Sequence, residues 1–302
     1  MDIQYLSVIV FVGFVVAETI ISARKGLALY DRRDSQANVV MGVLTFLSKM
    51  AIKGVSYLLY FYLYEYAIFE IPEDSIFWFI IGFLLNDFLF YWYHRMSHEV
   101  RMFWAIHVTH HSSPKLNITT AMRGSFVNNI FHTLFWAPLA LIGFSPYVII
   151  TSDAFSYFYQ LWLHTRIVPK LGFYEWAFNT PSHHRVHHGS NEQYLDKNYG
   201  AVLILWDRMF GTFAKEEKEV TYGLTKPINS YNPIKLIFHE CVDIYRDIRR
   251  TPTFKERMRI LLRRPGYSSD PFGVEETKKN SANDSTNSPE TRSKSQMPSL
   301  NS

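Results

Sequence analysis

Histidines are concentrated in one stretch of the chain, where hydrophobic segments separate them. Eleven of the twelve histidines lie between residues 94 and 188, and all of these except His132 are grouped. They form four groups, which are His94 with His98, then His107 with His110 and His111, then His164 alone, and finally His183, His184, His187 and His188. The intervening hydrophobic segments are long enough to cross a lipid bilayer. A fold that gathers these groups on one side of a membrane predicts metal chemistry on a lipid.

The spacing within the groups is that of ligands on one face of a helix. His94 and His98 are four residues apart, and side chains at this spacing share a face. His110 and His111 follow His107 by three and four residues, and His187 and His188 follow His184 in the same way. Side chains at these spacings also share a helix face. With His164 these make nine predicted ligands, and His183 is a tenth candidate, either as a ligand or as a support behind the ligands. The isolated His132 and His239 are expected to be hydrogen-bonded core residues.

The ligand set predicts two metal ions held mainly by imidazole nitrogens. The single cysteine, Cys241, excludes a cysteine-type zinc site, an iron–sulfur cluster and a disulfide framework. Glu99 is the only acid within the first two histidine groups, so a carboxylate-rich di-iron site is not expected. Imidazole binds iron, zinc, copper and nickel. Iron is favoured, because two redox metals beside a lipid chain can activate oxygen.

The hydrophobic segments predict an all-α, polytopic membrane protein. Residues 5–21 are interpreted as a retained membrane helix and not as a signal peptide, because Asp2 precedes them and no small-residue cleavage site follows. The loop at 24–34 is basic and is therefore expected to lie in the cytoplasm. Residues 39–66 exceed one crossing and contain Lys49 and Lys53, so either a helix starts near Ile52 or a surface helix leads into the span.

The later segments bring every histidine group to the cytoplasmic side. Residues 75–93 are apolar and run directly into His94. Residues 126–142 and 146–163 predict a membrane hairpin closed at 143–146, which returns His164 to the same side. The fold class is therefore four or five transmembrane helices under a cytoplasmic histidine-rich di-metal cap, with the number of spans before Ser75 left open.

The remaining sequence divides the chain into three parts. We expect N-terminal transmembrane helices at 1–74, a catalytic domain at 75–267 and a disordered polar tail at 268–302. Residues 245–264 form a basic amphipathic segment that Pro252 divides, and it either attracts anionic lipid or is an ordinary solvated face. Asp87 and Asp153 lie in or near apolar spans, where an acid is either functional or hydrogen-bonded between helices. The net charge of +4 is small and confined to a few loops, so no nucleic-acid partner is expected.

The histidine motifs resemble those of the membrane fatty acid hydroxylase and sterol desaturase superfamily. Its pattern of HxxxH, then HxxHH, then HHxxHH is matched by residues 94–98, 107–111 and 183–188. Within that superfamily the sequence is most similar to the alkylglycerol monooxygenase family, through residues 179–189, 196–213 and 222–229. The resemblance covers residues 77–267. The N-terminal segments are similar only in their hydrophobic character.

This resemblance implies a di-iron oxygenase that inserts one oxygen atom into a lipid C–H bond. In the alkylglycerol monooxygenase family that bond is on the ether-linked carbon, the product breaks down to a fatty aldehyde and glycerol, and tetrahydrobiopterin is the reductant. Some superfamily hydroxylases have a further HxxxH motif that ends at the position of His164. Here Gln160 stands at the start of that motif, so a water or an amide oxygen would replace one ligand. Glu99 is either a pterin contact or a surface acid near Arg101.

Several alternatives remain open from the sequence. The same metal site could desaturate a sterol or acyl chain. A metal-binding membrane transporter or sensor is the alternative from another functional class. No dinucleotide fingerprint is present, so a pterin or a separate electron-transfer protein must supply electrons. Expected partners are a membrane lipid and molecular oxygen, and the expected location is the endoplasmic reticulum or a bacterial inner membrane. The aromatic candidates for lining the substrate approach are Trp92, Tyr93, Trp104 and Tyr199.

Overall fold

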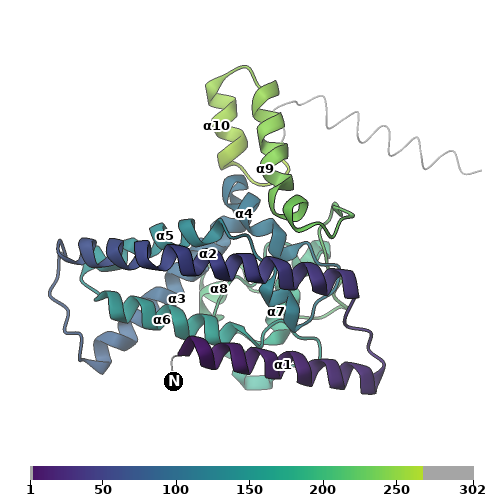
Figure 1. The fold of residues 1–302 in the computed structure, drawn as a ribbon, viewed down its shortest axis with the longest axis horizontal. Coiled ribbons are helices and arrows are strands. Elements are labelled where there is room, and N and C mark those ends of the chain that lie inside the picture. Colours follow the sequence, from purple (N-terminus) through teal and green to yellow (C-terminus); the bar gives the residue numbers. More distant parts are fainter. Residues whose placement is uncertain (1–2, 268–302) are drawn as a thin grey trace, which may run out of the picture.

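The computed structural model describes residues 3–267, and this part of the chain is helical without a β-strand (Figure 1). Its α-helices are α1 (Ile3–Lys25), α2 (Arg32–Tyr64), α3 (Ile76–Glu99), α4 (Arg101–His111), α5 (Asn128–Ile142), α6 (Pro146–Gln160), α7 (Pro181–His187), α8 (Leu205–Met209), α9 (Pro233–Arg250) and α10 (Phe254–Leu262). Three short 3₁₀ helices, η1 (Ile118–Met122), η2 (Gly172–Trp176) and η3 (Glu192–Tyr194), lie in the connections. The predicted all-α class is confirmed. The predicted tail at 268–302 lies outside the described residues.

Helix α2 is one unbroken helix, so the first of the two alternatives, a start near Ile52, is wrong, and the helix already runs through the residues before the span. It begins at Arg32, where the Asp31 side chain accepts a hydrogen bond from the Asp34 backbone. The two lysines do not end it, because both side chains lie against aromatic rings. The Lys49 ammonium is 3.9 Å from the centroid of the Tyr157 ring on α6, and the Lys53 ammonium is 5.3 Å from that of Tyr57.

Helices α5 and α6 form the predicted hairpin. The turn is made by Gly143, whose φ of 123° is accessible to glycine, and by Ser145, whose side chain accepts a hydrogen bond from the Val148 backbone. Helix α5 packs along α2, and helix α6 packs along α3. Aromatic and aliphatic side chains from these four helices fill the largest core, with Trp136 and Ala140 fully buried at its centre.

Two helices of the described region are long and apolar enough to cross a membrane. They are α2 and α3, and only 17% and 28%, respectively, of their most apolar windows are buried inside the protein. A helix in the core of a soluble protein would bury most of such a window. Exposed Phe46, Leu47 and Leu58 on α2 illustrate the difference. The further spans and the cytoplasmic orientation stay predictions.

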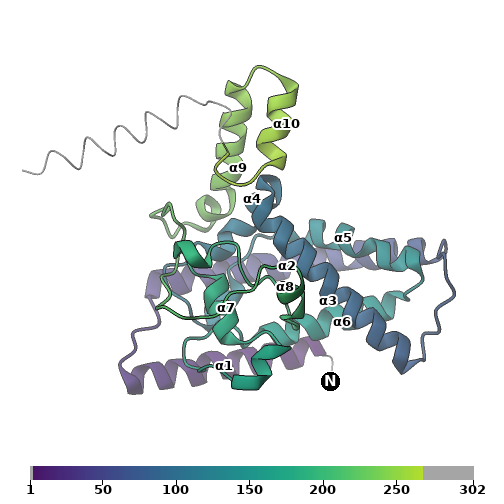
Figure 2. The ribbon, with the colours of Figure 1, turned by 180° about the vertical axis from the view of Figure 1, so that it is seen from behind.

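The C-terminal helices α9 and α10 form a small hairpin that projects from the body (Figures 1 and 2). The chain breaks between them at Pro252, as predicted. Helix α9 begins at Pro233, before the predicted basic segment, because Asn232 caps it. The hairpin is attached to α4 through Arg101, whose guanidinium lies 2.7 Å from both Glu240 and Asp247.

The two acids of the apolar segments are both partnered. Asp153 on α6 lies 3.2 Å from His132 on α5, which is an interhelical contact, but the buried Nε2 atom of His132 does not make the predicted hydrogen bond. Asp87 on α3 accepts hydrogen bonds from the backbone of Val202 and Leu203 and from the indole of Trp206. Asp87 therefore joins α3 to the loop that leads into α8. His239 on α9 is partly buried and pairs with the Leu236 carbonyl.

Candidate metal centre

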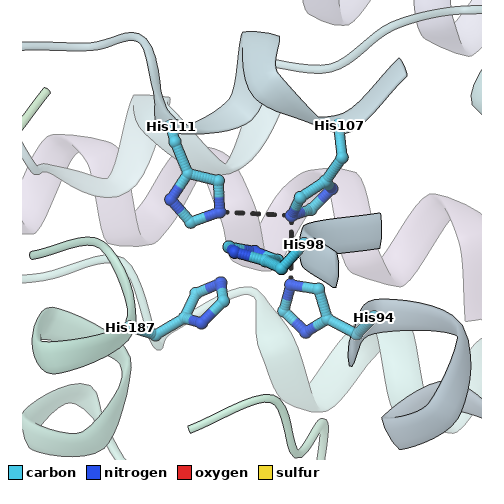
Figure 3. A group of neighbouring side chains, drawn as sticks. All are labelled: His94, His98, His107, His111 and His187. Atoms are coloured by element: carbon cyan, nitrogen blue, oxygen red, sulfur yellow. Dashed lines mark hydrogen bonds between the residues drawn. The ribbon is translucent and has the colours of Figure 1, made fainter. Parts of the chain in front are cut away.

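The fold gathers nine of the ten predicted histidines into two adjacent groups. In each group, every histidine contributes one ring nitrogen to a set in which all the nitrogens lie within 4.8 Å of one another. Group 1 consists of His94, His98, His107, His111 and His187 (Figure 3). Group 2 consists of His110, His164, His184 and His188. The groups share a boundary, because the rings of His111 and His188 are stacked with their centroids 4.5 Å apart.

Helices α4 and α7 each supply both groups. On α4, His107 and His111 belong to group 1, whereas His110 belongs to group 2. At α7, His187 belongs to group 1, and His184 and the C-cap residue His188 belong to group 2. The sequence prediction placed each HxxHH motif on one ligand face. The structure instead divides each motif between two groups, because neighbouring residues on a helix point about 100° apart.

Backbone carbonyls set the orientation of three rings. The Nδ1 atoms of His94, His110 and His187 lie 2.8, 3.0 and 2.9 Å from the carbonyl oxygens of Tyr199, Arg123 and Lys197. A carbonyl only accepts, so each Nδ1 carries the hydrogen and a neutral ring presents the lone pair of Nε2. Such outer contacts fix the tautomer of a metal ligand.

The inward nitrogens have the spacing of ligands on one ion. In group 1, the Nε2 of His107 lies 3.1 Å from the Nε2 atoms of both His94 and His111. In group 2, the Nε2 of His184 lies 2.8 Å from that of His164 and 3.1 Å from that of His188. A single N–H group cannot make linear hydrogen bonds to two neighbouring nitrogens at once, so hydrogen bonding alone does not explain these contacts. Two nitrogens bound at about 2.1 Å and at right angles to each other would stand about 3 Å apart, so a metal ion fits this arrangement.

Burial keeps the imidazoles neutral and therefore able to bind a cation. Removal from water lowers the pKa of His107, His111 and His184 well below the ordinary value, and nearby imidazoles lower it further. Burial also lowers the pKa of His110 to about 4. The Nε2 atoms of His98 and His187 are buried and have no hydrogen-bond partner. A bound ion would satisfy both atoms.

Comparison with known proteins identifies the domain that holds these groups. Residues 79–212 match the fatty acid hydroxylase family. The chain carries a fatty acid hydroxylase domain. This domain contains all nine histidines of groups 1 and 2.

Similar proteins match most of the chain. Alkylglycerol monooxygenases of Xenopus tropicalis and Homo sapiens are 42% and 40% identical to it, in each case over 85% of this chain and 58% of the relative. An ornithine lipid hydroxylase of Rhizobium tropici is 32% identical over 44% of this chain and 41% of its own. The chain thus spans a little under three fifths of the length of the two animal relatives. No solved structure matches it.

His183, the tenth candidate, lies in neither group of the hydroxylase domain. Its ring packs against Phe213, with the centroids 5.4 Å apart. Its backbone carbonyl accepts a hydrogen bond from the Asn198 side chain, which also bonds to Ala214. Burial lowers the pKa of His183 to about 4. His183 therefore lies in the packing behind the α7 histidines.

The polar candidates near the hydroxylase domain's histidines have other partners. Glu99 makes ion pairs with Arg95 at 3.1 Å and Arg264 at 3.3 Å, and its contact with a pterin stays a prediction. Arg101, the other proposed neighbour of Glu99, is bound to α9 instead. The Gln160 amide donates hydrogen bonds to Ser156 within α6.

Two of the four aromatic candidates contact the group 1 rings. Trp104 and Tyr199 lie 5.3 and 5.2 Å from the ring centroid of His98. The Tyr199 hydroxyl is buried without a hydrogen-bond partner, and burial raises its pKa, so it stays protonated. Trp92 packs against Phe210. Tyr93 belongs to the core and donates its hydroxyl hydrogen to Asn128.

Several residues that support group 2 escaped the sequence prediction. Arg123 and Asp34 form a buried ion pair at 2.7 Å beside His110. Glu18 on α1 is buried and accepts hydrogen bonds from Thr165, next to His164, and from the Ile118 backbone. Glu18 and Asp34 each occur as an acid within or beside an apolar segment. An acid in such a segment is an exception to the hydropathy pattern, and this exception could have marked both residues as candidates.

Proposed function

We propose that this chain is a non-haem di-iron monooxygenase that hydroxylates a C–H bond of a membrane lipid. The observation that carries the proposal is the pair of buried histidine groups, each able to hold one ion. Among the described residues, neither group includes an acid or a cysteine. The nearest carboxylate, Asp196, lies 3.5 Å from the outward Nδ1 of His98.

The proposed roles follow from the positions of the side chains. Group 1 and group 2 would each hold one iron, and the bound irons would supply oxygen activation. The carbonyls behind His94, His110 and His187 hold the Nδ1 protons and so orient the rings. The half-buried ring of Trp104 and the buried ring of Tyr199 would exclude water on the group 1 side.

A lipid substrate agrees with the similarity to lipid-modifying relatives and with the apolar helices. We extend the proposal to cleavage of glyceryl ether lipids because the relatives that match most of the chain are alkylglycerol monooxygenases. Molecular oxygen and an external reductant, with tetrahydrobiopterin as the first candidate, complete the reaction. We also propose a multi-pass membrane protein in which the transmembrane helices of 1–74 precede the domain at 75–267, and in which the histidine groups of that domain face the cytoplasm.

Reconstitution of the full chain tests this function. The purified protein in lipid nanodiscs should bind about two irons and consume oxygen when given an alkylglycerol and tetrahydrobiopterin, with release of a fatty aldehyde. Fewer than about two metals per chain, with the histidines intact, would contradict the dinuclear centre. Oxidation or desaturation of an acyl lipid or sterol without aldehyde release would contradict ether cleavage.

A further inference from the structure

A second polar site lies between α2, α5 and α6. It is a cavity of about 100 Å³, and none of its lining residues belongs to group 1 or group 2. Its charged and titratable wall consists of Lys49, Lys53, Tyr57 and Tyr60 from α2, His132 from α5, and Asp153 and Tyr157 from α6. The site is unusual because α2 presents an apolar face beside it, where Phe46, Leu47 and Met50 are exposed. Charged groups in such surroundings mark a binding site by default.

The charges in the cavity favour an anion. The two lysines bring two positive charges, and Asp153 brings the one carboxylate. That carboxylate already contacts His132 at 3.2 Å. The Lys49 ammonium contacts the face of Tyr157, which leaves its N–H groups able to donate to a ligand in the cavity. With a neutral imidazole, the wall has a net charge of +1.

The cavity has the size and depth of a lipid headgroup site. A volume of about 100 Å³ equals that of about three waters, which is enough for one phosphate group. Helix α2 has 33 residues and is therefore about 50 Å long, whereas the hydrocarbon core needs about 30 Å. Asp34 and Asn38 at its start bind Arg123 beside the metal centre. The last 20 or so residues then span the membrane, and Lys49 and Lys53 lie about one to two turns inside the boundary, where lysines can snorkel.

The cavity and the metal centre share a wall of aromatic rings. Trp136 stacks on His132 with the ring centroids 3.8 Å apart, and it contacts Phe90 at 6.5 Å. Phe90 in turn contacts His94 of group 1 at 5.4 Å. A lipid held in the cavity would therefore lie in the same leaflet as the metal centre and close to it.

We propose that the cavity between α2, α5 and α6 binds the phosphate group of an anionic membrane lipid through Lys49 and Lys53. The inference uses the membrane placement made under the proposed function, but it does not depend on iron or on oxygen chemistry. Binding can therefore be measured in protein that turns over no substrate, and the two proposals can fail separately.

Native mass spectrometry of the full chain released from nanodiscs tests the site. Nanodiscs of phosphatidylcholine with and without phosphatidic acid supply the probe lipid, and the circular dichroism of the helices reports on the fold. The wild type should retain phosphatidic acid, and the double variant Lys49→Gln/Lys53→Gln should bind it at least tenfold more weakly. The exposed pair Lys218→Gln/Lys226→Gln removes the same charge and should bind as the wild type does. Equal binding by both double variants would overturn the proposal.

Two further measurements keep the result interpretable. Asp153→Asn removes the competing negative charge, so it should tighten phosphatidic acid binding several-fold. Weaker binding in that variant would mean that the cavity takes a cation or a hydrogen-bond donor, which overturns the proposal. Inorganic phosphate is the soluble probe. If phosphate binds with the same dependence on the lysines and the lipid does not, the ligand is a free anion and the lipid assignment is wrong.

Discussion

The Nδ1 atom of His110 lies 3.0 Å from the backbone carbonyl oxygen of Arg123. The Arg123 guanidinium is held by Asp34 at 2.7 Å and Asn38 at 2.8 Å, both near the start of α2. It also donates to the Thr109 carbonyl on α4. The orientation of one metal-binding ring thus depends on an ion pair with a helix that contributes no ligand.

Asp34→Asn should therefore weaken metal binding at group 2. The substitution leaves the buried Arg123 without its counter-charge, and losing one partner of a buried pair costs about 3–5 kcal/mol of unfolding free energy. Loss of such an outer contact lowers metal affinity by about 10–100-fold. Competitive chelation followed by metal analysis checks this result. Asp243→Asn, in an exposed pair with Arg246, is the matched control and should leave affinity unchanged. Equal affinity in the two variants would show that the ion pair does not position His110.

Adjacent histidines on α4 should affect different ions. His110→Gln removes a ligand from group 2, whereas His111→Gln removes one from group 1. Each variant should lose about one of two metals, and the spectrum of the remaining iron should differ between them in Mössbauer measurements.

His183→Gln is the matched control for these two variants, because His183 lies in neither group. It should keep both metals. Indistinguishable spectra from His110→Gln and His111→Gln would contradict the division of α4 between two groups.

The sequence predicted the helical hairpin of α5 and α6 and the gathering of nine histidines, because both depend on local pattern. Apolar length, Gly143 and Pro146 define the hairpin, and the spacing of His94 and His98 defines a helix face. The division of each HxxHH motif could not be predicted in this way. It depends on how α4 and α7 are rotated relative to α3, and that rotation is set by packing across the whole domain.

The start of α2 was left open for a related reason. A hydropathy pattern treats Lys49 and Lys53 as interruptions of a span. In the structure Lys49 lies against a ring on α6, which is remote in sequence, and Lys53 lies against a ring about one turn along α2. The support of His110 by Arg123 and Asp34 was also missed, because its members are 89 residues apart. Single-residue patterns contain no information on such pairing.

Acidification should destabilise the metal-free protein. Burial lowers the pKa of His110 from 6.5 to about 4, so between these values the unfolded chain binds a proton that the folded chain does not. The stability contributed by the neutral ring is therefore complete above pH 6.5, falls as the pH drops towards 4, and is absent below that. His111 and His184, whose pKa values are also lowered, add to the effect. Thermal unfolding of chelator-treated protein across this range measures it. A melting temperature that rises on acidification would contradict the neutral state of these rings.

Gly143→Ala should destabilise the hairpin that positions His164. Gly143 has a φ of 123°, and a Cβ atom there would lie 2.0 Å from the backbone oxygen of Phe69. Both sides of this contact are backbone, and the Ile68 and Phe69 amides donate to the end of α5, so the loop cannot move without losing hydrogen bonds. Strain of this kind costs about 1–3 kcal/mol, and the clash adds to it.

Gly13→Ala is the matched control for the hairpin, since no atom lies within 4 Å of a Cβ at that position of α1. Alanine is favoured over glycine in a helix by up to about 1 kcal/mol, so this variant should be as stable as the wild type or slightly more stable. Denaturant unfolding in detergent, followed by tryptophan fluorescence, compares the two. If Gly143→Ala unfolds at the same denaturant concentration as Gly13→Ala, then the loop at Phe69 is not packed against the hairpin turn in the folded protein.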